Sequence, residues 1–347
     1  MPAARNDQPT GPTPPAPAGI LNREFLCDVT THPSCHASTL TATATGGMLA
    51  AWFGGQHEKA PDVGIWLTRR DAAGPWSAPQ EVADGRQPDG RRWPCWNPVL
   101  FTRRDGAIML FYKVGPAPST WWGLWRLSRD DGRTWEPPRR LPEGILGPIK
   151  NKPIELPDGS LLSPSSSEHD GWRVHLERSR DGGATWDATA PLNDGWSLAA
   201  IQPSLLRLGG PCLLAIGRTR QGWLFEARSA DLGYTWGPPV LAGLPNPNSG
   251  TDAVTLRDGR HLLVYNHTAT GRSPLNLALS ADGVAWQAAA VLEDDPGEYS
   301  YPAVIQTRDG LVHITYTWRR ERIRYVVVDP DRLTPRPLRD GAWPSDG

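Results

Sequence analysis

Long apolar runs, paired cysteines and net charge are all scarce in this sequence of 347 residues. No run of eighteen or more apolar residues occurs, which excludes a membrane-spanning helix. The 36 basic and 37 acidic side chains leave a net charge of −1, so the chain as a whole does not attract nucleic acid or a membrane surface, and any charge effect must be local. The cysteines lack CxxC spacing and are interpreted as buried thiols, and we expect neither a metal nor another cofactor. They are Cys27, Cys35, Cys95 and Cys212.

The first nineteen residues differ in composition from the rest of the chain. They hold six prolines and no apolar stretch, so residues 1–19 are predicted to form a disordered tail rather than a secretory signal. On this basis we expect a cytoplasmic protein. Residues 20–347 are predicted to form one domain.

What the sequence does contain is a repeated turn. A segment with Ser or Thr, then Asp, then Gly, then Trp occurs about every fifty residues, a period typical of repeat architectures. Asp accepts hydrogen bonds from nearby backbone amides, Gly permits the bend and Trp packs the turn down. This motif therefore closes a hairpin and performs no chemistry. The copies, some of them degenerate, are Thr68–Trp76, Ser128–Trp135, Ser179–Trp186, Ser229–Trp236 and Ser280–Trp286.

A second repeated signal sets the number of units at six. Asp-Gly or Gly-Gly pairs recur at the same period between apolar runs, where they predict hairpins. Each unit therefore has four strands, and such units arranged radially form a propeller. We predict an all-β fold, a six-bladed β-propeller of four-stranded antiparallel blades. The sixth unit lacks a Trp turn, and we expect Ile20–Val29 to supply its outer strand.

Strand alternation assigns the repeated turns to one rim of the propeller. A site is therefore expected on the other rim, near the starts of the innermost strands. Basic residues from at least four blades fall on that rim, with acids and tyrosines between them, and Trp121 and Trp122 offer a flat surface for a sugar. Any one of these basic residues, taken alone, would ordinarily form a salt bridge on a loop. Their convergence nevertheless suits an anionic ligand, because Arg binds a carboxylate with two parallel hydrogen bonds.

These features resemble those of sialidases. The SxDxGxTW turns match the Asp boxes, or BNR repeats, of that superfamily, and the segments GPIKNKP, LPNPNSG and EYSYPA are similar to its bacterial and plant sialidase-like branch. Arg218 and Arg272 stand eleven and eight residues before the serines of the fourth and fifth turns, and the resemblance implies that they hold the substrate carboxylate. It also implies an acid in the first-blade loop, here Asp62 or Glu58, that protonates the leaving oxygen.

Three further positions bear on the resemblance. It implies a nucleophilic tyrosine at the start of the sixth inner strand, where spacing favours Tyr301 and a local Tyr-Ser pair favours Tyr299. Gln202 stands in place of the glutamate that activates this tyrosine. The arginine of the first blade is missing, and His36 opens the segment found there.

We therefore expect a glycoside hydrolase, similar to an exo-sialidase, that removes a terminal acidic sugar: sialic acid or a related ulosonic or uronic acid. Lys150 or Lys152 would replace the missing arginine. For the second step, either Tyr301 attacks the anomeric carbon or a water is activated by Glu168 or Asp252. A non-catalytic carbohydrate-binding propeller and a polysaccharide lyase are the alternatives, and the oligomeric state stays open. The expected substrate contacts are Arg218, Arg272, Lys150, Lys152, Asn97, Asp252 and His36.

Overall fold

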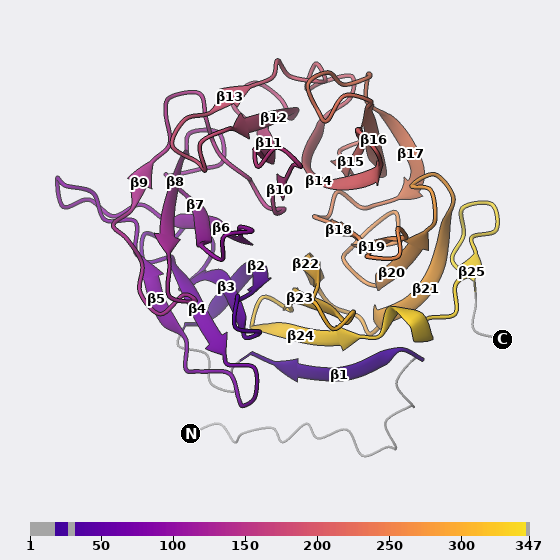
Figure 1. Cartoon of the computed structure of the whole chain (residues 1–347), viewed down its shortest axis with the longest axis horizontal. Helices are drawn as coiled ribbons and strands as arrows, with labels where there is room; N and C mark the ends of the chain where they lie inside the picture. The colour runs from indigo at the N-terminus through magenta and orange to yellow at the C-terminus, as the bar shows by residue number, and fades with distance from the viewer. Residues whose placement is uncertain (1–17, 27–31, 345–347) are drawn as a thin grey trace.

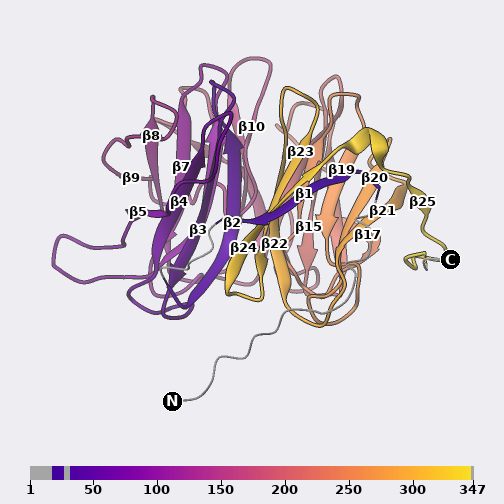
Figure 2. The ribbon, with the colours of Figure 1, turned by 90° about the horizontal axis from the view of Figure 1, so that it is seen from below.

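Six antiparallel sheets stand around a central axis in the computed structural model (Figure 1). The structure describes residues 18–26 and 32–344, so nearly all of the tail predicted for residues 1–19 lies outside the described residues. Figure 2 shows the strands running roughly along the axis. Within the described part, the one helical segment is the short 3-10 turn η1 (Pro330–Arg332). The prediction of an all-β, six-bladed propeller is confirmed.

Five blades are built from strands that follow one another in the chain, innermost strand first. Blade 1 contains β2 (Ser34–Ala42), β3 (Met48–Gly55), β4 (Gly64–Arg70) and β5 (Gln80–Ala83). Blade 2 contains β6 (Cys95–Thr102), β7 (Ile108–Val114), β8 (Trp122–Ser128) and β9 (Arg139–Arg140). Blade 3 contains β10 (Ile154–Glu155), β11 (Leu161–Ser167), β12 (Arg173–Ser179) and β13 (Asp187–Ala188). Blade 4 contains β14 (Ala200–Gly209), β15 (Cys212–Thr219), β16 (Trp223–Ser229) and β17 (Val240–Pro245). Blade 5 contains β18 (Asp252–Thr255), β19 (His261–Tyr265), β20 (Leu275–Ser280) and β21 (Trp286–Glu293).

Blade 6 joins the two ends of the chain. Its inner strands are β22 (Tyr299–Gln306), β23 (Val312–Trp318) and β24 (Arg322–Val328), and β1 (Ile20–Phe25) pairs antiparallel with β24 on the outside. The expected closure of the ring by the N-terminal strand is thus confirmed, although the strand is shorter than Ile20–Val29. The sequence did not indicate β25 (Arg336–Pro337), which adds a fifth strand to the edge of blade 5.

The Asp boxes are turns held by their own side chains. In the copy on blade 3, Thr185 donates to Asp181 from both its backbone N–H (2.8 Å) and its hydroxyl (2.6 Å). The Gly183 N–H donates to the Ser179 hydroxyl at 2.8 Å. The hydrogen bond from the Thr185 hydroxyl is the main reason that the pKa of Asp181 is lowered to about 2. The carboxylate thus stays ionised and structural, as the sequence predicts.

Apolar side chains fill the space between neighbouring blades. Leu49, Ile65, Leu100 and Leu110 belong to one such cluster, which joins blades 1 and 2. Cys35 and Cys95 are buried thiols and Cys212 is a half-buried thiol, while Cys27 lies outside the described residues. Among the described residues, no helix has the length and apolar character needed to cross a membrane.

Candidate active site

Four of the six innermost strands carry the same β-bulge. In each, two residues face a single residue of the neighbouring strand, and the first of the two has a left-handed backbone. The φ angles are 56° at Ala37, 37° at Asn97, 55° at Gln202 and 51° at Tyr301. Left-handed residues other than glycine are uncommon and cluster at functional sites. The bulges therefore mark the part of the inner strands where the predicted site residues lie.

Tyr301 is the centre of a cationic cluster. Its hydroxyl accepts a hydrogen bond from the Arg218 guanidinium at 2.8 Å. The guanidinium carbons of Arg218 and Arg272 lie 5.3 and 5.7 Å from the centre of its ring, and the Lys150 ammonium lies 5.7 Å from it. The His36 ring packs 4.3 Å away, centre to centre. The structure therefore brings together residues predicted from blades 1, 3, 4, 5 and 6.

Tyr299, the alternative nucleophile, occupies a different environment. Its side chain is fully buried and packs against Trp318, with ring centres 6.5 Å apart. Its hydroxyl accepts from Arg319 at 3.4 Å. Of the two tyrosines, Tyr301 is the one that lies among the cations.

Among the described residues, the groups that accept hydrogen bonds from Arg218 are all uncharged. Its guanidinium donates to the backbone and side-chain oxygens of Asn248, at 3.0 and 3.2 Å, and to Tyr301. It also lies 5.0 Å from the ring centre of Trp172, whose indole N–H donates to Glu168 at 3.0 Å. The residue is 6% exposed, and its Nε lacks a hydrogen-bond partner. A buried guanidinium without a carboxylate favours a site for an added anion.

Arg272 belongs to a chain of ion pairs that links blades 5, 6 and 1. It donates to Glu298 at 2.7 Å, and Arg320 donates to both oxygens of Glu298 at 3.0 Å. Arg320 also donates to Glu58 at 2.6 Å. Burial would raise the pKa of Glu298, but the charges of Arg272 and Arg320 outweigh it and lower the pKa. Glu58 is therefore connected to the cluster around Tyr301.

Asp62, the other acid of the first-blade loop, closes its own loop. Its carboxylate accepts from the backbone N–H of Gln56 at 3.0 Å. Its backbone carbonyl accepts from Arg92 at 2.9 Å. These contacts hold the loop between β3 and β4, whereas Glu58 extends from the same loop toward Arg320.

The Lys150 ammonium is buried and all three of its N–H groups have acceptors. They are Asn151 Oδ1 (2.8 Å), the Thr251 carbonyl (2.8 Å) and the Pro302 carbonyl (2.6 Å). Burial is the main reason that the pKa of Lys150 is lowered to about 7. Lys150 therefore lies close to Tyr301, but its three N–H groups already donate to protein oxygens.

Lys152 and Asp252 pair with each other, at 2.9 Å. Asp252 is 2% exposed and also accepts from the Ser204 hydroxyl (2.8 Å) and the Val304 N–H (2.8 Å). These contacts tie blades 3, 4, 5 and 6 together near the axis. They leave Asp252 no open oxygen for a water and give Lys152 a structural partner.

His36, Asn97 and Gln202 line the inner strands as buried polar residues. Burial, followed by the charges of Arg320, Arg272, Arg218 and Lys150, lowers the pKa of His36 well below its ordinary 6.5, so the ring is neutral. Its Nδ1 lies 3.0 Å from the Thr317 hydroxyl. Asn97 is 6% exposed, and the Gln202 Oε1 is buried without a hydrogen-bond partner.

Four contributors to the site were not among the residues selected from the sequence. Glu298 and Arg320 hold the ion-pair chain, Trp172 supports Arg218, and Gly250 packs so closely that a Cβ there would lie 2.9 Å from Lys150 and 3.2 Å from Tyr301. The sequence places Glu298 and Arg320 on the rim where the site is expected, but gives no reason to choose them as site residues. The others act through contacts between distant blades, which spacing does not show.

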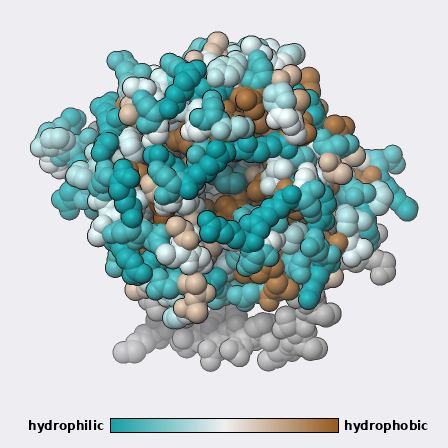
Figure 3. Space-filling view, viewed as in Figure 1, coloured by the Kyte–Doolittle hydropathy of each residue, from teal (hydrophilic) through white to brown (hydrophobic). Residues whose placement is uncertain are grey.

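The arrangement is suited to an acidic organic ligand rather than to a metal. Figure 3 looks onto the opposite end of the propeller, the rim of the Asp-box turns and η1, where hydrophilic and apolar residues both border the centre of the ring. No group of three or more His, Cys, Asp or Glu in residues 18–26 and 32–344 is arranged to hold a metal ion. Chemically, the cluster offers guanidinium groups for a carboxylate, a tyrosine hydroxyl beside them and carboxylates at its edge.

Comparisons with known proteins agree with this fold. The family model described as a BNR repeat-like domain matches residues 46–314. A curated protein named sialidase, from Bacteroides fragilis, is 26% identical over 213 residues, which is 54% of this chain and 38% of that protein. The chain thus spans well under half the length of this relative.

Solved structures share the architecture at low identity. The Hadza microbial sialidase Hz136 superposes with a TM-score of 0.74 at 17% identity, over 87% of this chain and 67% of that one. A leech intramolecular trans-sialidase, solved with 2,7-anhydro-Neu5Ac, gives 0.74 at 16% identity, over 91% and 71%. A Dyadobacter fermentans protein of unknown function gives 0.71 at 18% identity, over 88% and 98%. The chain belongs to the BNR repeat-like family of the sialidase-like superfamily.

Proposed function

We propose that this protein is a glycoside hydrolase that removes a terminal acidic sugar, sialic acid or a related ulosonic or uronic acid, from a glycan. The observation that carries the proposal is Arg218, a guanidinium that is 6% exposed, has neutral partners and has an unpaired Nε. Burying an uncompensated charge costs free energy, and a ligand carboxylate would offset that cost. The names of the relatives, sialidase and trans-sialidase, point to the same substrate class.

Arg218 and Arg272 hold the carboxylate in this proposal, and Arg320 takes the place of the missing third arginine. The hydrogen bonds of Lys150 and Lys152 are already used by protein oxygens, which disfavours the lysines for this role. Arg320 also donates to protein carboxylates, those of Glu298 and Glu58, but its side chain is 31% exposed, so a ligand carboxylate can approach it and compete with them. Its charge also acts on His36, which packs against Tyr301.

Glu58 is proposed to protonate the leaving oxygen, with Asp62 as the alternative acid on the same loop. Glu58 is favoured because it extends to Arg320 at the edge of the cluster, at 2.6 Å, whereas Asp62 accepts from its own loop. In this proposal the ion pair opens when the substrate carboxylate takes the Arg320 guanidinium, and Glu58 then carries the proton. Loss of turnover in Glu58→Gln with activity retained in Asp62→Asn supports this assignment. The opposite result transfers the role to Asp62.

The second step is proposed to use Tyr301. Its oxygen attacks the anomeric carbon and its phenol proton passes to solvent water, while the leaving oxygen takes the proton from Glu58. Water then hydrolyses the glycosyl-tyrosine: its hydroxide goes to the anomeric carbon, its proton returns to Glu58, and the released tyrosine oxygen takes a proton back from solvent. The guanidinium of Arg218 donates to this oxygen at 2.8 Å and stabilises negative charge that develops there. The competing route, in which Glu168 activates water, gives inversion. A proton NMR spectrum of the first product from an α-linked substrate separates them, since the β-anomer contradicts attack by Tyr301.

A screen of fluorogenic glycosides of sialic acid, its deaminated analogue and glucuronic acid tests the proposal. Turnover of an acidic glycoside is expected, and Arg218→Ala and Arg272→Ala should abolish it while circular dichroism stays unchanged. Arg220→Ala is the matched control, because Arg220 stacks on Trp172 at 4.3 Å but is exposed.

A non-catalytic carbohydrate-binding propeller is the second candidate. Two observations favour it, because neither provides a base for the Tyr301 hydroxyl. Gln202, an amide, stands where the resemblance implies a carboxylate, and the described hydrogen-bond partner of the Tyr301 hydroxyl is the guanidinium of Arg218. Binding of acidic sugars without turnover of any glycoside in the screen would select this candidate over the hydrolase.

A further inference from the structure

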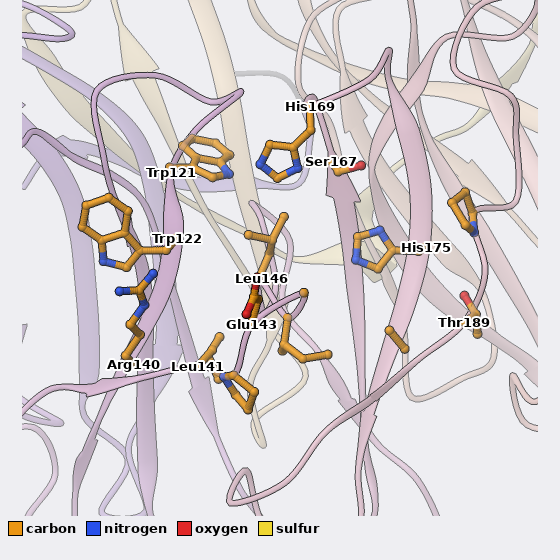
Figure 4. A pocket seen from close by; sticks show the side chains of 15 residues that line it. Trp121, Trp122, Arg140, Leu141, Glu143, Leu146, Ser167, His169, His175 and Thr189 are labelled. Carbon is orange, nitrogen blue, oxygen red and sulfur yellow. The ribbon is translucent and has the colours of Figure 1, made fainter.

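A cavity of about 830 Å³ lies between blades 2 and 3, away from Tyr301. Figure 4 shows Trp121 and Trp122 on one side, His175 and Thr189 on the other, and Glu143 and Leu146 between them. These side chains come from β8 and the loop before it, from the connection between blades 2 and 3, and from the outer part of blade 3. Pockets for small ligands have volumes of about 300–1,000 Å³, so this one can hold a molecule of that kind.

One wall of the cavity is aromatic and carries an unused hydrogen-bond donor. Trp121 is 4% exposed, and its indole Nε1 is buried without a partner. Its ring is held from behind by Trp96, edge to face, with centres 5.9 Å apart. Trp122 is half-buried beside it, with the Arg140 guanidinium 5.1 Å from its ring centre. Flat rings with a polar atom at the edge bind ligands that have both an apolar face and hydroxyl groups.

The opposite wall holds a histidine in a fixed orientation. His175 Nε2 lies 3.1 Å from Glu177 Oε1, and this carboxylate is fully buried. Glu177 also accepts from the backbone N–H groups of Leu146 and Gly147, at 2.8 and 2.7 Å. The carboxylate therefore orients the ring from one nitrogen, which leaves the other nitrogen available to a ligand.

The charge of this cavity differs from that of the Tyr301 cluster. Its lining includes one basic side chain, Arg140, and one acidic side chain, Glu143, while the rest is apolar, hydroxyl-bearing or imidazole. An anionic ligand would gain little here, because the two charges oppose each other. A neutral molecule with many hydroxyl groups fits both walls.

We propose that the cavity between blades 2 and 3 is a second carbohydrate site, which binds a neutral saccharide of one or two hexose units. The sugar stacks on the Trp121–Trp122 wall, accepts a hydrogen bond from the Trp121 Nε1–H and contacts His175 on the far wall. The proposal does not depend on hydrolysis at Tyr301, because it concerns the binding of a neutral sugar at a different set of residues.

One loop, between β11 and β12, connects the cavity with the cluster around Tyr301. Ser167 at the end of β11 and His169 of the loop between β11 and β12 line the cavity. Glu168 of the same loop accepts from Trp172, which lies against Arg218. A sugar held in the cavity is therefore bound beside the loop that supports the cation of the acidic site.

Titration of the full-length protein with lactose, maltose and cellobiose tests the proposal, by calorimetry and by saturation-transfer NMR. At least one disaccharide is expected to bind, and Trp122→Ala should weaken it at least tenfold. Trp121→Phe keeps an aromatic ring but removes the indole N–H together with the five-membered ring, and it should weaken binding several-fold. Trp196→Ala is the matched control, since Trp196 is 65% exposed and lies outside the cavity.

Two results would overturn the proposal. One is the absence of binding by all three disaccharides while the protein is folded. The other is binding that Trp122→Ala and Trp121→Phe leave unchanged. Arg218→Ala separates the two sites: loss of acidic-glycoside binding with retained disaccharide binding supports independent sites, whereas loss of both assigns the neutral sugar to the Tyr301 cluster and contradicts the proposal.

Discussion

Replacing Lys150 with Met is expected to change how the stability of the protein depends on pH. Burial lowers the pKa of Lys150 from 10.5 to about 7, and the side chain is 3% exposed. In the unfolded chain the lysine regains its ordinary pKa. Below pH 7 both states are protonated, and the folded state bears the whole cost of the buried charge, roughly 5 kcal/mol.

The cost disappears as the pH rises, because the folded lysine loses its proton before the unfolded one does. Between the two pKa values the unfolded state binds one more proton, so the free energy of unfolding rises by about 1.4 kcal/mol per pH unit for each such lysine. Lys113 is fully buried and its pKa is also lowered to about 7, mainly by burial. In the wild type, two lysines therefore contribute to the rise of the unfolding free energy with pH, and in Lys150→Met only Lys113 should contribute.

Urea unfolding followed by tryptophan fluorescence measures this difference, at several values from about pH 7.5 to about pH 9, above the pKa of the folded lysines and below the ordinary range of tyrosine. The slope of unfolding free energy against pH should be smaller in Lys150→Met than in the wild type by about 1.4 kcal/mol per pH unit. Lys113→Met is the matched variant and should show the same reduction, and the double variant should lose both. Parallel curves for wild type and Lys150→Met would refute the reasoning.

Three further changes test other parts of the structure. Tyr301→Phe removes the hydroxyl that accepts from Arg218; it should abolish turnover and cost roughly 1–3 kcal/mol of stability, measured by urea unfolding. Gly250→Ala places a Cβ 2.9 Å from Lys150 and 3.2 Å from Tyr301, so acidic-sugar binding measured by calorimetry should weaken while circular dichroism stays unchanged. Deletion of residues 1–26 removes β1 and uncovers the edge of β24; it should destabilise the protein by several kcal/mol, and an unchanged melting temperature would contradict the role of β1 in closing the ring.

Most of the architecture could be predicted because each blade repeats the same local chemistry. The Asp boxes hold their turns through contacts within a few residues, such as Ser179 with Asp181 and Gly183. Contacts this local leave a pattern in the sequence at every repeat. β25 left no such pattern, because two residues paired to the edge of blade 5 carry neither alternation nor a turn signal.

The candidate site was predicted in part. Arg218, Arg272 and Tyr301, which the resemblance to sialidases implies as site residues, lie next to one another in the structure, because the blade fixes their distances from the turns. The ion-pair partners of the charged residues could not be predicted from these spacings, because the partners lie far away in the sequence. Lys152 pairs with a residue 100 positions away, and Arg320 with one 262 positions away. Lys150 and Lys152 also lie before β10, which starts at Ile154.

The repeated bulge explains why this fold can carry different chemistries. At the same point of four inner strands it places a left-handed residue, which is Ala37, Asn97, Gln202 or Tyr301 according to the blade. The backbone of the bulge is common to the four blades, so it does not depend on the side chain. A substitution at one of these positions can therefore change the chemistry at the axis without changing the propeller. For this reason, likeness of fold to sialidases establishes the scaffold, whereas the substrate depends on the residues that occupy the bulges and on the cations around them.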